Sequence, residues 1–248
     1  MGDQYSRSRL IFGGAAMERL KNSRVAVFGL GGVGGSAAEA LARGGVGALD
    51  LVDNDVFSPS NLNRQIFALR STVGVYKTDA AAARIADIDP DCRVTLHRTF
   101  FLPENADSFD FSLYDYVVDA VDTVTAKLAI IMKAKASGVP VISCMGTGNK
   151  VDPSALKVAD ISGTSVCPLA RVMRKALRAR GVDHVTVVYS TEAPIDPDPE
   201  AAGEAPPPGR RSLPGSTSFV PGAAGLLIAS RVILDLTGFD PGDRRRGV

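Results

Sequence analysis

The chain has 248 residues, of which 45% are hydrophobic, and this is enough to bury the core of one large α/β domain. Its formal net charge of +1 argues against a generally polybasic protein, so contact with nucleic acid would need a local basic patch. Three cysteines form no CxxC pair, which argues against a cysteine-rich zinc site and suits a reducing cytoplasm. We therefore expect no zinc, and the polar start "MGDQYSRSRL" predicts no secretory signal.

Apolar runs of strand type alternate with segments of helical spacing through the first 150 residues. The pattern predicts strands at 24–29, 48–53, 93–98, 114–121 and 139–145. It predicts helices at 34–45, 77–89 and 125–138, with glycine or Pro90 marking their ends. Such repetition favours a Rossmann-like, doubly wound and mostly parallel sheet, with ligands at the carboxyl ends of the strands.

The regularity weakens after about residue 150, where we expect a C-terminal extension on the substrate side. A helix at 168–181 and a strand at 185–190 are followed by a stretch at about 193–216 that is rich in Pro, Gly and acid and predicts a flexible surface loop. The apolar segment 219–236 contains Arg231 and Asp235, which favours a buried helix over the alternative of membrane insertion. We expect one domain over 1–248, with an ATP-binding core at 1–150 and a substrate-side portion at 151–248.

A glycine-rich turn follows the first predicted strand. Gly29, Gly31 and Gly34 fit the pattern G-x-G-x-x-G between a strand and a helix, where phosphate can approach backbone N–H groups. Asp53 closes the next strand 19 residues after Gly34, where a carboxylate can accept hydrogen bonds from ribose hydroxyls. By itself this pattern fits NAD and other adenine nucleotides alike, and Asp53 as a plain strand-end cap is the structural alternative.

Polar residues after the second predicted strand indicate which nucleotide binds. Asn61, Arg64, Gln65 and Lys77 follow Asp53, and "DAVDT" places Asp119 and Asp122 near another strand end. Cations, amide donors and an acid on neighbouring strand ends suit a triphosphate with its metal, because such groups offset phosphate charge during bond rearrangement. A hydride-transfer site is not evident, since neither His97 nor His184 lies in this region. Ordinary solvated loop charges remain the alternative.

The combination "GLGGVGG…LVDNDVFSPSNLNRQIF…VGVYK…DAVDT" resembles the ubiquitin-activating-like adenylyltransferases, which include the activators of sulfur-carrier proteins. The resemblance covers about residues 5–150 and implies ATP and Mg²⁺ as ligands. It implies that Gly32 lies against the nucleotide, Asp53 on the ribose, and Asp122 near the metal. Asn61, Arg64 and Lys77 would bind the phosphates, with Arg64, Lys77 and Asp122 as the catalytic side chains. The expected nucleotide site also includes Gly29, Gly31, Gly34, Asp55, Gln65 and Thr123.

The same resemblance implies a homodimer in which an N-terminal arginine reaches the partner's ATP. The stretch "QYSR" offers Arg7 for that catalytic role, and Arg9 is the substitute.

The C-terminal half contains "VISCMGTGNKVDPSALKVADISGTSVCPLARVMRKALRARGV", then "VVYSTE", then "PGSTSFVPGAAGLLIA". These stretches are similar to the tRNA threonylcarbamoyladenosine dehydratases, which work on a modified adenosine beside the tRNA anticodon. The resemblance implies that ATP adenylates the threonine carboxylate and that ring closure then removes water. Because the attacking group is tethered to the acyl carbon, proximity favours closure without a protein nucleophile. The alternatives are an activator of a ubiquitin-like sulfur carrier and an inactive nucleotide-binding scaffold. A sulfur- or electron-relay protein would be a further partner.

A basic stripe is expected on the helix at 168–181. Arg171, Arg174, Lys175 and Arg178 recur at helical spacing and would hold tRNA phosphates, or form an ordinary solvated face. Cys144 follows a predicted strand, and Cys167 opens a predicted helix beside Pro168. Each is either an activated thiolate or a small packed side chain.

Overall fold

The computed structural model describes residues 3–198, 214–240 and 242. Its seven strands form one sheet in the order β3-β2-β1-β4-β5-β7-β6. All neighbouring strands are parallel except β6, which runs antiparallel to β7 at the edge. The strands are β1 (Arg24–Phe28), β2 (Ala48–Val52), β3 (Arg93–His97), β4 (Tyr116–Asp119), β5 (Val141–Cys144), β6 (Leu156–Asp160) and β7 (Thr186–Ser190). The predicted Rossmann-like, mostly parallel sheet is confirmed.

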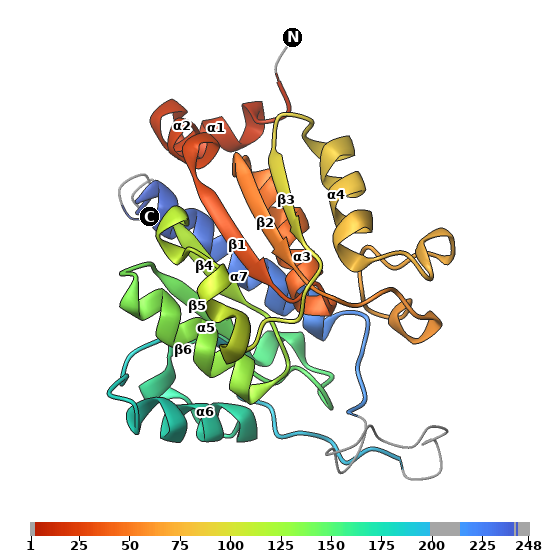
Figure 1. Cartoon of the computed structure of the whole chain (residues 1–248), viewed down its shortest axis with the longest axis vertical. Helices are drawn as coiled ribbons and strands as arrows, with labels where there is room; N and C mark the ends of the chain where they lie inside the picture. Colours follow the sequence, from red (N-terminus) through yellow and green to blue (C-terminus); the bar gives the residue numbers. More distant parts are fainter. Residues whose placement is uncertain (1–2, 199–213, 241, 243–248) are drawn as a thin grey trace.

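Helices cover both faces of the sheet (Figure 1). Side chains of α2, α3, α4 and α7 share one apolar core with the strands, and those of α5 and α6 share a second core on the other face. The helices are α1 (Ser6–Phe12), α2 (Gly14–Asn22), α3 (Gly32–Gly44), α4 (Lys77–Ile88), α5 (Val124–Ala136), α6 (Pro168–Arg178) and α7 (Val220–Thr237). Buried apolar area on both faces is the main stabilising contribution, at about 25 cal/mol per Å².

The C-terminal helix α7 packs on α3 at van der Waals distance. A Cβ at Gly225 would lie 2.3 Å from the Val33 carbonyl oxygen, and one at Gly44 would lie 2.5 Å from Ile233 Cδ1. By length and hydropathy α7 could cross a membrane, but Val220, Ala224, Ile228 and Val232 are buried in the core. The expected buried helix is therefore part of the fold.

Several elements differ from the predictions. The N-terminal helices α1 and α2 and the edge strand β6 are not among the predicted elements. Strand β6 is only half-buried, so it lacks the continuous apolar run of the central strands. In the predicted loop 193–216, residues 199–213 lie outside the described residues, and 193–198 and 214–217 carry no regular secondary structure. The division at residue 150 stays a prediction, although β7 pairs with β5 and α7 packs on α3 across it.

A buried ion pair joins α5 to the sheet. The Lys127 ammonium lies 3.1 Å from the Asp119 carboxylate, with the side chains 1% and 0% exposed. Lys127 also donates to the Cys144 carbonyl at 2.7 Å, and the Ser143 hydroxyl donates to Asp119 at 2.5 Å. The second Asp119 oxygen accepts the Val121 N–H at 3.2 Å, so the pair fixes the chain just beyond β4.

Replacing Lys127 tests this pair. We expect Lys127→Met to lower the free energy of unfolding by about 3–5 kcal/mol, because it leaves Asp119 buried without its cation. Urea denaturation measures the effect. Lys133→Met, on the same helix but paired with the fully exposed Asp107, is the control and should change little. Equal effects of the two substitutions would contradict the assignment.

Candidate nucleotide site and the adjoining cavity

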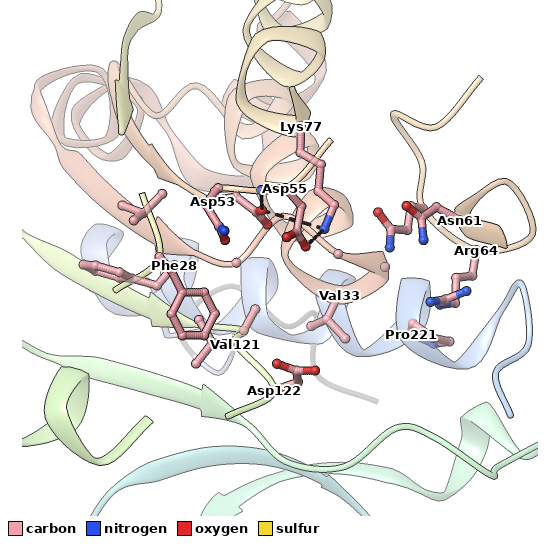
Figure 2. Close-up of a pocket in the computed structure, with 18 of the residues that line it drawn as sticks. Phe28, Val33, Asp53, Asp55, Asn61, Arg64, Lys77, Val121, Asp122 and Pro221 are labelled. Carbon is pink, nitrogen blue, oxygen red and sulfur yellow. Dashed lines mark hydrogen bonds and ion pairs between the residues drawn. The ribbon is translucent and has the colours of Figure 1, made fainter. Parts of the chain in front are cut away.

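A pocket of about 570 Å³ lies at the carboxyl ends of β1, β2 and β4. The strand order reverses between β1 and β4, and such switch points are where doubly wound sheets bind ligands. Figure 2 shows Asp53, Asp55 and Lys77 grouped on one side of the pocket, with Asn61 and Arg64 beside them and Asp122 opposite. Of the residues predicted for the nucleotide, the lining includes Gly29, Gly31, Gly32, Asp53, Asp55, Asn61, Arg64, Gln65, Lys77 and Asp122.

Glycine is required at the positions of this turn for different physical reasons. Gly29 has a φ of +87°, which side chains rarely adopt. A Cβ at Gly34 would lie 1.8 Å from the Gly29 carbonyl oxygen, so the fold itself excludes any side chain there. At Gly31 the nearest atom to an added Cβ is Gln65 Nε2 at 4.0 Å, so protein packing leaves this position open. The space over Gly31 belongs to the pocket, where backbone N–H groups at the start of α3 can meet phosphate.

Asp53 links two strand ends. Its carboxylate accepts the N–H of Leu30 at 2.7 Å and that of Asp55 at 2.9 Å, which are the bonds of a structural cap. It also lines the pocket, so the cap and ligand interpretations do not compete. Burial raises the pKa of Asp53 above its ordinary value, although the Lys77 ammonium at 3.7 Å acts in the opposite direction.

Lys77 brings a buried cation to the pocket from the first residue of α4. Its ammonium forms an ion pair with Asp55 at 2.6 Å, and the Asp55 side chain is 59% exposed. This contact holds the lysine beside Asp53 at the pocket wall (Figure 2).

The turn that follows β2 supplies an arginine and two amides. Arg64 donates to the Ser60 carbonyl at 2.9 Å and to Asn63 at 2.8 Å, and its partial burial lowers its pKa. Asn61 lines the pocket and its side-chain oxygen accepts the Ser58 N–H at 3.0 Å, so its amide nitrogen can donate to a ligand. Gln65 is buried, and its Oε1 is the buried side-chain polar atom that lacks a hydrogen-bond partner within the described residues. An orphaned acceptor at a pocket wall suits a ligand that donates a hydrogen bond.

Asp122 and Thr123 lie between β4 and α5. The Thr123 hydroxyl donates to Asp122 at 3.3 Å, and Thr123 is the N-cap residue of α5 rather than part of the pocket lining. Across residues 3–198, 214–240 and 242 no group of three or more His, Cys, Asp or Glu side chains is arranged to hold a metal ion. A metal here would therefore need oxygens from a ligand in addition to Asp122.

The N-terminal arginines lie far from the pocket of their own chain. Arg7 is exposed on α1, and Arg9 pairs with Asp3 at 2.7 Å. Figure 1 places α1 at the end of the sheet where β1 begins, whereas the pocket lies where β1 ends. A role for either arginine in a partner's site stays a prediction.

The basic stripe on α6 is only partly directed to solvent. Arg171 and Lys175 are exposed, but Arg174 is half-buried and donates to the Thr164 carbonyl at 2.8 Å. Arg178 forms an ion pair with Asp183 at 3.2 Å. The stripe's contact with tRNA stays a prediction, in which Arg174 also has a structural role.

A second cavity, of about 660 Å³, lies beside the pocket. Cys144 and Cys167 line it, and both are buried. Burial raises the pKa of the Cys144 thiol to about 12, so this group is protonated at neutral pH and is no thiolate nucleophile. The stretch "GTGN" at 146–149 is the sequence signal for an acyl pocket at this strand end, and all four of its residues line the cavity. Gly146 leaves open space there, whereas a Cβ at Gly148 would lie 2.9 Å from Pro214 Cβ.

Residues 5–246 match the ThiF family. The chain belongs to that family. A Bacillus subtilis tRNA threonylcarbamoyladenosine dehydratase is 45% identical over 240 residues, which are 94% of each chain. The Escherichia coli protein of the same name is 38% identical over 195 residues, or 75% of this chain and 73% of the relative. The crystal structure of that enzyme in complex with AMP has a TM-score of 0.85 at 32% identity and covers 98% of this chain and 96% of its own.

The relatives also separate the two sequence-based interpretations of the acyl partner. An adenylyltransferase and sulfurtransferase of Ogataea parapolymorpha is 33% identical over 166 residues, but these are only 42% of its length. The resemblance to the dehydratases extends over nearly the whole chain and is confirmed, whereas the likeness to this adenylyltransferase and sulfurtransferase is weaker and covers 66% of the chain.

Two glycine substitutions distinguish ligand binding from backbone packing in this turn. We expect Gly31→Ala to leave the melting temperature nearly unchanged but to weaken ATP binding about tenfold or more, because the added methyl group occupies ligand space. Gly34→Ala should instead destabilise the fold, because its Cβ meets a backbone oxygen. Thermal unfolding and ATP titration of both variants measure the two effects. Unchanged ATP binding by Gly31→Ala would remove this turn from the nucleotide site.

Proposed function

We propose that this protein is an ATP-dependent tRNA threonylcarbamoyladenosine dehydratase. The observation that carries the proposal is 45% identity to a Bacillus subtilis protein of that name over 94% of both chains. The pocket at the sheet switch point supports it, because the Escherichia coli enzyme has been crystallised with ATP and with AMP in the same fold. The substrate is threonylcarbamoyladenosine next to the anticodon of tRNA.

The chemistry has two steps. A carboxylate oxygen of the threonyl group attacks the α-phosphorus of ATP, which forms an acyl adenylate and releases pyrophosphate. The carbamoyl oxygen or nitrogen of the same side chain then attacks the acyl carbon, AMP leaves with one of the original carboxylate oxygens, and the attacking group loses its proton. The net change in the nucleoside is the loss of one water. No covalent bond to the protein forms, which agrees with the buried, protonated Cys144.

Several charged and polar residues of the pocket have a role in this proposal. Asp53 accepts hydrogen bonds from the ribose, and the turn at Gly29–Gly34 approaches the phosphates. Asn61, Arg64 and Lys77 bind the triphosphate and offset negative charge as the bond to the α-phosphate rearranges. The orphaned Gln65 Oε1 provides one further acceptor on the pocket wall.

Mg²⁺ would be held at this site by Asp122 together with phosphate oxygens of ATP. It is usually held by one or two carboxylates together with substrate phosphates, and Asp122 supplies one such carboxylate at the wall. The ion would neutralise phosphate charge there, and Asp122 would orient it.

The remaining parts of the proposal concern partners. The enzyme works in the cytoplasm as a homodimer, with Arg7, or Arg9 in its place, reaching the partner's ATP from α1. Arg171, Arg174, Lys175 and Arg178 on α6 contact tRNA phosphates, which predicts a strong dependence of tRNA affinity on salt. A sulfur- or electron-relay protein would act outside the adenylation chemistry.

Purified protein with ATP, Mg²⁺ and tRNA that carries threonylcarbamoyladenosine tests the function. We expect the digested tRNA to contain a nucleoside lighter by one water, in amounts that match the AMP formed, by mass spectrometry. An unchanged nucleoside, with pyrophosphate exchange only on addition of a ubiquitin-like carrier protein, would overturn the proposal in favour of carrier activation.

Two substitutions test the assigned charges in the same assay. Arg64→Ala and Asp122→Asn should each lower turnover about 10²- to 10³-fold with the fold intact, because each removes a charge beside the reacting phosphates. Arg70→Ala, an exposed arginine outside the pocket lining, is the matched control and should retain turnover. Wild-type turnover by Asp122→Asn would remove that residue from the mechanism.

A further inference from the structure

The second cavity shares a wall with the nucleotide pocket. Val33, Arg64, Asp122, Thr147 and Ser216 are among the residues that line both. Two of these, Arg64 and Asp122, are the charged groups assigned above to the phosphates and the metal. A group held in the second cavity would therefore meet the nucleotide at its phosphates, which is where an attacking carboxylate has to lie.

The charges deeper in the cavity are already occupied by protein partners. The Lys127 ammonium is bonded to Asp119 and to the Cys144 carbonyl, and Lys150 donates to the Glu192 carbonyl at 2.5 Å. The cavity thus offers its charged groups at the shared wall and mostly neutral or apolar surface beyond it, from Cys144, Met145, Cys167 and Leu169. An occupant that fits is charged at one end and neutral along the rest.

The cavity wall is built from strained and tightly held backbone. Asn149 has a φ of +58°, which is uncommon for a residue other than glycine. Its side chain accepts the Gly215 N–H at 2.6 Å, its N–H donates to the Gly215 carbonyl at 2.8 Å, and its carbonyl accepts the Ile195 N–H at 2.8 Å. Val166, beside the lining residue Cys167, is also in the left-handed region with a φ of +63°. Strain of this kind persists where the surroundings fix it and is concentrated at functional sites.

We propose that this cavity receives the threonylcarbamoyl side chain of the substrate nucleoside. The inference rests on the proposed function and assigns the binding of the group that ATP adenylates to residues of β5, the 146–150 turn and the start of α6. The carboxylate lies at the wall that contains Arg64 and Asp122. The neutral carbamoyl group, the hydroxyl group and the methyl group lie in the remainder, where Thr147, Asn149 and the apolar side chains contact them.

Gly146 gives a way to fill this cavity without touching the nucleotide pocket. It lines the second cavity only, and a Cβ there would lie 3.9 Å from Cys167 Sγ and from Leu169 Cβ, both in ordinary contact. Its φ lies outside the left-handed region, so a side chain is tolerated by the backbone. Gly163, which also has a tolerant φ and has open space around its Cβ position, lines neither cavity and is the matched control.

The experiment compares Gly146→Ala, Gly146→Val and Gly163→Val with the wild type. We expect KM for the modified tRNA to rise with side-chain size at Gly146, by about tenfold or more for valine, because the added atoms take the space of the substrate. KM for ATP should stay within about twofold, and Gly163→Val should match the wild type in both. ATP protection against thermal unfolding should be equal in all four proteins.

Failure of the cavity assignment and failure of the proposed function give different results. Unchanged KM for tRNA in Gly146→Val, or an equal rise in KM for ATP, would overturn the assignment of this cavity to the threonylcarbamoyl side chain. If Gly146→Val does not fold, the alanine variant decides in the same way. Failure of the wild type to remove water from the modified nucleoside would instead refute the proposed function and leave no substrate for this cavity.

Discussion

The nucleotide pocket depends on how closely the backbone passes itself between β1 and α3. Gly34 lies against the Gly29 carbonyl, at a distance that excludes a side chain, and this contact fixes where α3 begins. The same turn is packed from the other side, since Cβ positions at Gly32 and Gly225 would meet Pro221 and the Val33 carbonyl within 3 Å. Helix α7, from the far end of the chain, therefore supports the floor of the pocket. The first N–H groups of α3 are held toward the phosphates without any catalytic side chain in the turn.

Around this floor the sheet brings charges from four separate segments to one edge. Asp53 ends β2, Lys77 begins α4, Arg64 lies in the turn between them, and Asp122 follows β4. Each of these side chains also forms a hydrogen bond or an ion pair with another protein group, so the site is organised before substrate arrives. Preorganised charges of this kind stabilise a transition state without the cost of reorienting solvent. The buried Asp119–Lys127 pair also fixes the wall that the two cavities share, because Asp119 accepts the N–H of Val121 in that wall.

Local sequence was sufficient for the parallel sheet and for most of the nucleotide pocket. Strands such as β1 and β2 are buried on both faces and are therefore continuous apolar runs, and the glycine spacing marks the turn after the first of them. The edge strand β6 is half-exposed and has no such signal. Contacts between distant segments were also beyond the sequence. Nothing in the helical spacing of Arg174 shows that its guanidinium turns to Thr164, and nothing near Lys127 shows its burial against Asp119. The second cavity needs the 144–150, 167–169 and 214–216 segments together, so "GTGN" at 146–149 marks one part of it and only the assembled fold shows the whole cavity.

The central claim is that ATP activates the substrate carboxylate by adenylation, and labelled oxygen tests it most directly. The measurement uses modified tRNA whose threonyl carboxylate carries ¹⁸O, with the enzyme, ATP and Mg²⁺, and follows the label in the released nucleotide by mass spectrometry. If the carboxylate attacks the α-phosphorus and AMP leaves on ring closure, one labelled oxygen appears in AMP for each water lost from the nucleoside. Label found in inorganic phosphate alongside ADP, or AMP without label, would contradict the account.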